Sequence, residues 1–107
     1  MDSIMYIEQV EEEMFQLKKE NEPIGTFKLI DLSKGVVKLE QLQVKDYISP
    51  ARILEVFEII QSYVEETGHN ELHVESHSDT IDFLLQHQQF KKKDAEKRLW
   101  IYEVNHK

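Results

Sequence analysis

The stretch that decides the fold runs from Val36 to Gly68 and reads VVKLEQLQVKDYISPARILEVFEIIQSYVEETG. Its first nine residues are rich in apolar and β-branched residues, which predicts a strand. Ser49 and Pro50 supply an N-cap and a first-turn proline, and Gly68 is typical of the position just after a helix. The sequence therefore predicts a strand and then a helix over 50–67. One face of this helix carries the apolar residues at three-and-four spacing, namely Ile53, Val56, Phe57, Ile60, Tyr63 and Val64.

Within the predicted strand 36–44, the alternation of apolar and polar residues slips by one position. Val37 and Leu39 share one parity, whereas Leu42 and Val44 share the other. One extra residue in a strand is a β-bulge, which bends the strand and re-aims its edge. The alternative is that the two halves face different layers, and the pattern alone favours neither interpretation.

The flanking segments extend this strand–helix unit into a mixed sheet. Polar, turn-prone residues separate the apolar stretches upstream, which predicts two antiparallel hairpins, and the second turn places Gly35 where a positive φ is needed. The predicted fold is α/β (α+β), with a mixed, mostly antiparallel sheet of five or six strands and both main helices on one face. Besides 36–44 and 50–67, its elements are strands over 14–17, 26–32, 72–76 and 99–104, a helix over 79–87 and a charged loop over 91–96.

The first thirteen residues fit two structures. Met5, Tyr6 and Ile7 suit a strand, whereas Val10, Met14 and Leu17 are spaced as a helix face. We favour the strand.

Composition narrows the class of protein. A chain of 107 residues with 40% hydrophobic and 32% charged residues predicts a single domain over 1–107. The absence of cysteine excludes a disulfide scaffold and a thiol nucleophile. A net charge of −8 opposes nucleic-acid binding. No apolar run approaches the ~20 residues of a membrane span, and the N-terminus does not resemble a signal peptide, so we expect a cytoplasmic, acidic protein with no membrane partner.

The order of elements, together with several local motifs, resembles the GNAT superfamily of N-acetyltransferases. The motifs are the Glu-Pro-Ile-Gly turn entry at 22–25, the bulged strand, the helix ending Glu-Glu-Thr-Gly at 65–68, and Ile-Asp-Phe-Leu-Leu at 81–85 running into Phe90. The resemblance covers about residues 14–104.

This resemblance implies a binding site for acetyl-CoA or CoA. In the family, the bulged strand splays from its neighbour, its free backbone bonds the pantetheine arm, and the next helix N-terminus receives the pyrophosphate. A general base, where the family has one on the bulged strand, maps to Glu40. The positions that match the arm and the pyrophosphate are Leu42, Gln43 and Val44, and then Ser49, Ala51 and Arg52.

The sequence departs from the family in three places. The R/Q-x-x-G-x-G/A phosphate signature has no glycine here, and Pro50 removes an amide donor. The family's general-acid tyrosine, five residues before Phe90, is replaced by Leu85, which cannot transfer a proton. The thirteen residues before Met14 are too few for the two helices of the acceptor wall. We therefore expect a short, degenerate member that acts as a binding or regulatory module without transferase activity. The alternative is a minimal acetyl-CoA-dependent N-acetyltransferase in which Glu40 or a water is the base.

Two other features have competing interpretations. His73, Glu75 and His77 alternate as metal ligands on a strand would, but alternation of polar residues is also typical of a strand with one wet face, and we assign no metal site. The acidic run at 11–13 is typical of solvated surface, with a docking role as the alternative.

The final strand predicts a partner. Both of its faces are apolar, with Trp100, Tyr102 and Val104 on one and Leu99 and Ile101 on the other. The face that the helices leave bare needs cover, either from residues 1–13 or from a second chain. Because a two-fold dimer is the commonest way to hide an apolar face, we expect a homodimer or a protein partner on the sheet face that lacks helices.

Overall fold

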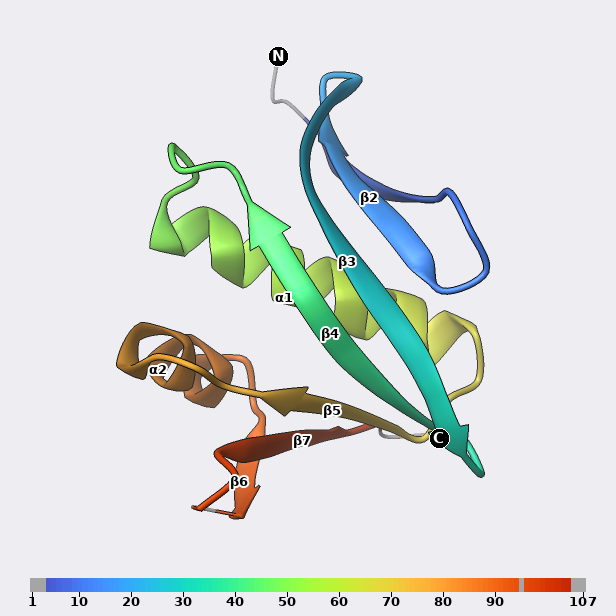
Figure 1. The fold of residues 1–107 in the computed structure, drawn as a ribbon, viewed down its shortest axis with the longest axis vertical. Helices are drawn as coiled ribbons and strands as arrows, with labels where there is room; N and C mark the ends of the chain where they lie inside the picture. Colours follow the sequence, from blue (N-terminus) through green and yellow to red (C-terminus); the bar gives the residue numbers. More distant parts are fainter. Residues whose placement is uncertain (1–3, 95, 105–107) are drawn as a thin grey trace.

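The computed structural model describes residues 4–94 and 96–104, which form one seven-stranded sheet and two helices (Figure 1). The strands lie in the order β1-β2-β3-β4-β5-β7-β6, and every neighbouring pair is antiparallel except β4 and β5. The elements are β1 (Met5–Gln9), β2 (Met14–Lys19), β3 (Glu22–Ser33), β4 (Val36–Val44), α1 (Pro50–Glu66), β5 (Glu71–Glu75), α2 (Asp79–His87), β6 (Lys91–Asp94) and β7 (Leu99–Glu103).

The predicted fold class is confirmed, and β4 and α2 have the predicted bounds. The preference for a strand near the N-terminus is also confirmed, because Met5–Gln9 forms β1. The prediction of a charged loop over 91–96 was wrong in its first part, where Lys91–Asp94 forms β6 on β7. Backbone pairing needs no apolar side chains at a sheet edge, where lysines are common. The sheet therefore has seven strands rather than five or six.

Two-residue turns join the central hairpins. Glu20 and Asn21 have φ of 55° and 66°, and Lys34 and Gly35 have φ of 50° and 81°. Two consecutive positive φ values are the signature of a type I′ turn, which matches the twist of the strands it connects. The turn thus lies at 20–21, and the segment 22–25, predicted as a turn entry, belongs to β3.

Both helices cover the same face of the sheet, as predicted. Trp100 and Tyr102 alternate onto one face of β7. The Trp100 indole N–H donates to Asp82 of α2 over 3.0 Å, and the Tyr102 hydroxyl donates to Glu65 of α1 over 2.7 Å. In Figure 1, α1 crosses behind β3 and β4. The side chains with the least exposure lie in this layer and include Leu17, Ile24, Phe27, Phe57, Ile60, Leu72 and Leu85.

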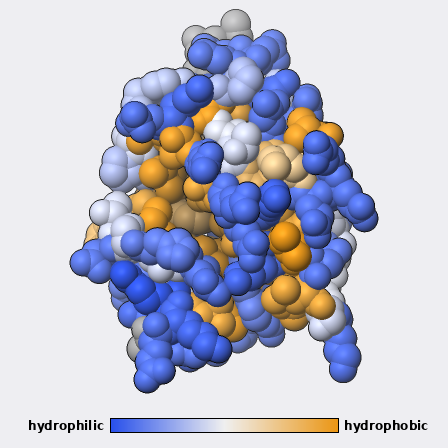
Figure 2. Space-filling view, in the orientation of Figure 1, coloured by the Kyte–Doolittle hydropathy of each residue, from blue (hydrophilic) through white to orange (hydrophobic). Residues whose placement is uncertain are grey.

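The helix-free face is largely polar (Figure 2). Lys38 projects from this face, with its Nζ 2.8 Å from Glu75 and 3.4 Å from Glu40. Trp100 and Tyr102, in contrast, lie beneath the helices, so they need no cover from a second chain or from the N-terminal segment. Leu99 and Ile101, on the opposite face of β7, are half-buried. The homodimer stays a prediction. Sedimentation equilibrium tests it, and a species of 12.8 kDa at tens of micromolar would contradict it.

Candidate functional site

The sheet opens between its two parallel strands. β4 and β5 pair over Val36–Leu39 and Glu71–Val74, and beyond Leu39 no described strand pairs with β4 on this side. The opening coincides with a bulge, because Thr26 of β3 opposes Gln43 and Lys28 opposes Glu40, so that two β4 residues face one on β3. Gln41, inside the bulge, has φ of 53°. The bulge interpretation of the sequence pattern is therefore confirmed.

The separated ends of β4 and β5 enclose a slot of about 450 Å³. This volume is within the range of small-molecule sites. Figure 2 shows a hollow beside β4 with hydrophobic residues at its floor and hydrophilic residues around it. The apolar lining consists of Leu39, Leu42, Phe57, Val74 and Ile81, and the polar rim of Lys38, Glu40, Gln41, Glu75 and His77.

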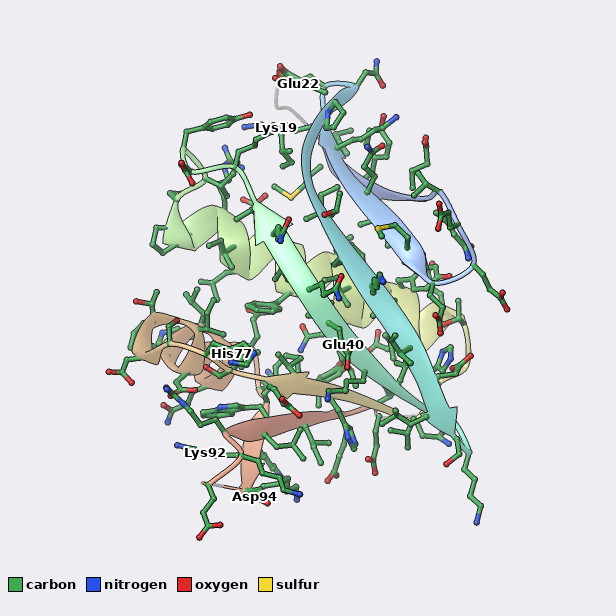
Figure 3. All side chains as sticks on the ribbon, in the orientation of Figure 1. Lys19, Glu22, Glu40, His77, Lys92 and Asp94 are labelled. Carbon is green, nitrogen blue, oxygen red and sulfur yellow. The ribbon has the colours of Figure 1, made fainter. Side chains whose placement is uncertain are left out.

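Charged side chains of both signs meet at the rim. The hydrogen bond from Lys38 to Glu75 raises the pKa of Lys38, and the same bond lowers the pKa of Glu75. Both groups are therefore ionised at neutral pH. Figure 3 shows Glu40 on β4 and His77 just beyond β5, on opposite sides of the opening. The rim thus offers two carboxylates, one ammonium and one imidazole to whatever enters the slot.

The structure distributes the residues predicted to bind CoA over two places. Leu42 lines the slot together with Glu40, and Gln43 and Val44 continue β4 towards its end. Ser49, Ala51 and Arg52, by contrast, begin α1. The predicted site is therefore brought together at its Glu40–Leu42 end, and the three residues at the start of α1 belong to its far end.

The start of α1 is occupied by its own capping interactions. The Ser49 side chain accepts the Arg52 backbone N–H, and the Arg52 guanidinium lies 2.9 Å from the Glu55 carboxylate. Pro50 at the first turn has no N–H to donate. A phosphate cradle needs free amides and uncompensated positive charge. The residues present therefore suit the pantetheine end of a CoA molecule and do not suit its pyrophosphate end.

Within the described part of the chain, the slot lacks the tyrosine that the family uses as its general acid. Leu85, at the family's tyrosine position, is fully buried, and no tyrosine is among the described residues that line the opening. Tyr102 is bonded to Glu65, and burial together with this bond raises its pKa to about 12. A hydroxyl with this pKa is too weak an acid for proton transfer near neutral pH.

The alternating His73, Glu75 and His77 do not converge. His73 Nε2 lies 2.8 Å from Glu71, Glu75 is bonded to Lys38, and His77 lies beyond the end of β5. Across residues 4–94 and 96–104, no group of three His, Asp or Glu side chains is placed to hold a metal ion. Sequence reasoning did not place Lys38, Glu75 and His77 at the slot. Their position depends on where β5 ends relative to the bulge, which no local pattern records.

The bulged strand, the splayed parallel pair and the helix that follows define the fold of the GNAT superfamily of N-acetyltransferases. A GNAT acetyltransferase from Elizabethkingia anophelis with acetyl-CoA bound superposes with a TM-score of 0.72 at 15% identity, over 85% of this chain and 75% of that one. A GNAT acetyltransferase from Staphylococcus aureus gives 0.69 at 11% identity, over 86% and 67%. The PaiA N-acetyltransferase from Thermoplasma acidophilum in complex with coenzyme A gives 0.63 at 14%, over 85% and 60%. At 11 to 15% identity, these superpositions show that the fold is shared and nothing beyond the fold.

By sequence, no protein-family model matches the chain, and no curated protein is similar to it. The matched part spans 60 to 75% of the three solved chains described above. The connection between β1 and β2 is short, since residues 10–13 alone join the two strands. Helices of an acceptor wall have no place in that connection. Among the described residues, neither helix has the length and hydrophobicity of a membrane span.

Proposed function

We propose that this chain is a GNAT-fold binding module whose slot accepts the pantetheine arm of a CoA-type molecule and which transfers no acetyl group. The observation that carries the proposal is the opening of β4 from β5 after Leu39, which leaves a strand edge beside an apolar slot. An extended amide-containing chain binds such an edge through main-chain hydrogen bonds. Two of the solved neighbours contain acetyl-CoA or coenzyme A.

Two observations argue against acetyl transfer, one at the start of α1 and one at the family's general-acid position. At α1, Ser49 and Arg52 are engaged within the helix, so the phosphates gain little from the protein. The sequence position that matches the family's general-acid tyrosine holds Leu85, which is buried and does not line the slot. Weak binding and no chemistry are the expected result.

Calorimetric titration with CoA and with pantetheine, which lacks the nucleotide phosphates, tests this proposal. Because the binding energy comes from the arm, we expect both ligands to bind with affinities that agree within about threefold. The expected Kd is about 1 mM, which corresponds to a binding free energy of about −4 kcal/mol. Acetyl-CoA should release no thiol above the buffer rate when amines are added. Absence of heat with both ligands at millimolar concentration refutes the proposal. Much tighter binding of CoA than of pantetheine would show that α1 does hold phosphate.

A matched pair of variants localises the binding. Leu42→Trp places an indole in the slot and should abolish the heat of pantetheine binding. Leu32→Trp, at an exposed position near the end of β3, should leave it unchanged. Equal binding by both variants would mean that the ligand binds elsewhere.

The second candidate function is a minimal acetyl-CoA-dependent N-acetyltransferase. It is favoured by the position of Glu40, whose carboxylate lies at the rim of the slot, where a base would take a proton from an incoming amine. Micromolar affinity for acetyl-CoA, with turnover that Glu40→Gln removes, would establish this function instead of the first.

A further inference from the structure

A second groove lies at the edge of the sheet, away from the slot. It runs between β1 and the outer side of α1 and has a volume of about 760 Å³. Four side chains give it an apolar floor, with Met5 and Ile7 from β1 and Ile59 and Tyr63 from α1. Of these, Ile7, Ile59 and Tyr63 are partly exposed. Contact with a partner would remove this apolar surface from water.

The backbone of β1 is free along this groove. β1 pairs with β2 over Met5–Gln9, and no other strand in the described part of the chain pairs with β1. One side of a five-residue strand therefore offers unpaired N–H and C=O groups. An extended peptide can add to such an edge as a further strand.

The wall of the groove formed by α1 is acidic. Glu55, Glu58 and Glu66 line it, and no lysine or arginine is among the described lining residues. Arg52 compensates Glu55, whereas Glu58 and Glu66 have no ion-pair partner within the described residues. Two uncompensated carboxylates beside an apolar floor favour a cationic occupant with long aliphatic stems.

We infer that this groove binds an extended basic segment of a partner protein, which adds to β1 as an eighth strand. Alternate side chains of such a strand project towards α1. Lysine or arginine at these positions places its stem on Ile59 and Tyr63 and its charge beside Glu58 or Glu66. The lengths agree, since Glu55 to Glu66 spans about 16 Å of helix and five strand residues span about 16 Å.

The test uses fluorescence anisotropy of a labelled peptide of four Lys-Val repeats with the full chain. We expect saturable binding that weakens as salt rises. Two further peptides serve as controls. A Glu-Val peptide reverses the charge, and a Lys-Val peptide with N-methyl groups on alternate amides keeps the charge but cannot pair with β1. Both should bind at least about tenfold more weakly. Equal binding of the methylated peptide would mean attraction to the overall negative charge and overturns the inference.

Paired charge reversals locate the site on the protein. Glu58→Lys combined with Glu66→Lys should weaken peptide binding at least about tenfold. Glu96→Lys combined with Glu103→Lys makes the same change in net charge at the opposite end of the sheet and should weaken it less than about threefold. An equal loss in the two double variants overturns the inference.

Two further measurements distinguish the groove from the slot and from self-association. Leu42→Trp should bind the peptide normally, since the groove does not depend on the slot, and loss of peptide binding in this variant would contradict the assignment. If the free protein self-associates in sedimentation equilibrium and Glu58→Lys with Glu66→Lys abolishes the association, the occupant is a second copy, and the inferred partner segment is wrong.

Discussion

Replacing Asp82 with asparagine should destabilise the protein in a way that depends on pH. Asp82 on α2 accepts hydrogen bonds from the Arg98 guanidinium and from the Trp100 indole. The nearby Ser76 side chain, whose hydroxyl itself donates to the Ser78 carbonyl over 2.9 Å, contributes most to the low pKa of Asp82. With the Arg98 and Trp100 hydrogen bonds, it lowers this pKa from 3.8 to about 2. The carboxylate thereby ties α2, which carries Ile81 into the slot, to β7.

The pKa values give the magnitude. A decrease from 3.8 to about 2 corresponds to about 2.4 kcal/mol of free energy of unfolding. The Asp82 side chain keeps 20% of its surface exposed, so solvent screening reduces this figure, and we expect about 1–2 kcal/mol. Because the folded-state pKa is the lower one, this stabilisation is complete above about pH 4 and disappears as the pH falls towards 2.

Urea unfolding followed by circular dichroism, from pH 7 to pH 2.5, measures the effect. Parent and Asp82→Asn should differ by about 1–2 kcal/mol at pH 7 and converge as the pH approaches 2. Asp79→Asn is the control, since Asp79 also lies beside Arg98 but its side chain is fully exposed, and it should cost no more than about 0.5 kcal/mol. A difference between parent and Asp82→Asn that stays constant with pH would refute the assignment to the carboxylate charge.

Three further predictions concern the bulge, a close contact and the last strand. Gln41→Gly should raise the free energy of unfolding by about 0.5–1 kcal/mol in urea, because glycine adopts the φ of 53° without strain, and a lower stability would contradict this. Gly25→Ala should cost about 1–3 kcal/mol and lower the melting temperature, since its Cβ would lie 2.5 Å from the Gln43 carbonyl oxygen; an unchanged melting temperature would argue against the contact. Since the folded-state pKa of Tyr102 is raised to about 12, stability should fall as the pH rises from 10 to 12, and Tyr102→Phe should lose this part of the decrease in alkaline unfolding curves; identical curves would contradict it.

Local signals made much of the fold predictable. The apolar residues of 36–44 predicted the strand β4, while their alternation left the bulge as one of two alternatives, and Ser49 caps α1 as its sequence position predicted. β6 was not predictable, because Lys91–Asp94 has no apolar pattern and is a strand through its pairing with β7. Whether a segment of this kind pairs depends on tertiary context.

The candidate site was predictable on one side. The resemblance to the GNAT superfamily implied Glu40 and Leu42 as site residues, and both line the slot. The opposite side, with Glu75 and His77, depends on a pairing between segments more than thirty residues apart. That Arg52 is bound by Glu55 was also hidden, since a spacing of three residues permits the ion pair without requiring it.

The short β4–β5 ladder also has a consequence for how the chain folds. β1 to β4 form a meander in which each strand pairs with the next along the chain, so these contacts form by closing short loops. The parallel register of Val36–Leu39 with Glu71–Val74 requires α1 and its connections to be in place first. We therefore expect the two parts of the sheet to join late, with the N-terminal meander protected from amide exchange in pulse-labelled refolding before β5 and β7 are. The slot would then lie at the junction of β4 and β5, the last part of the sheet to form.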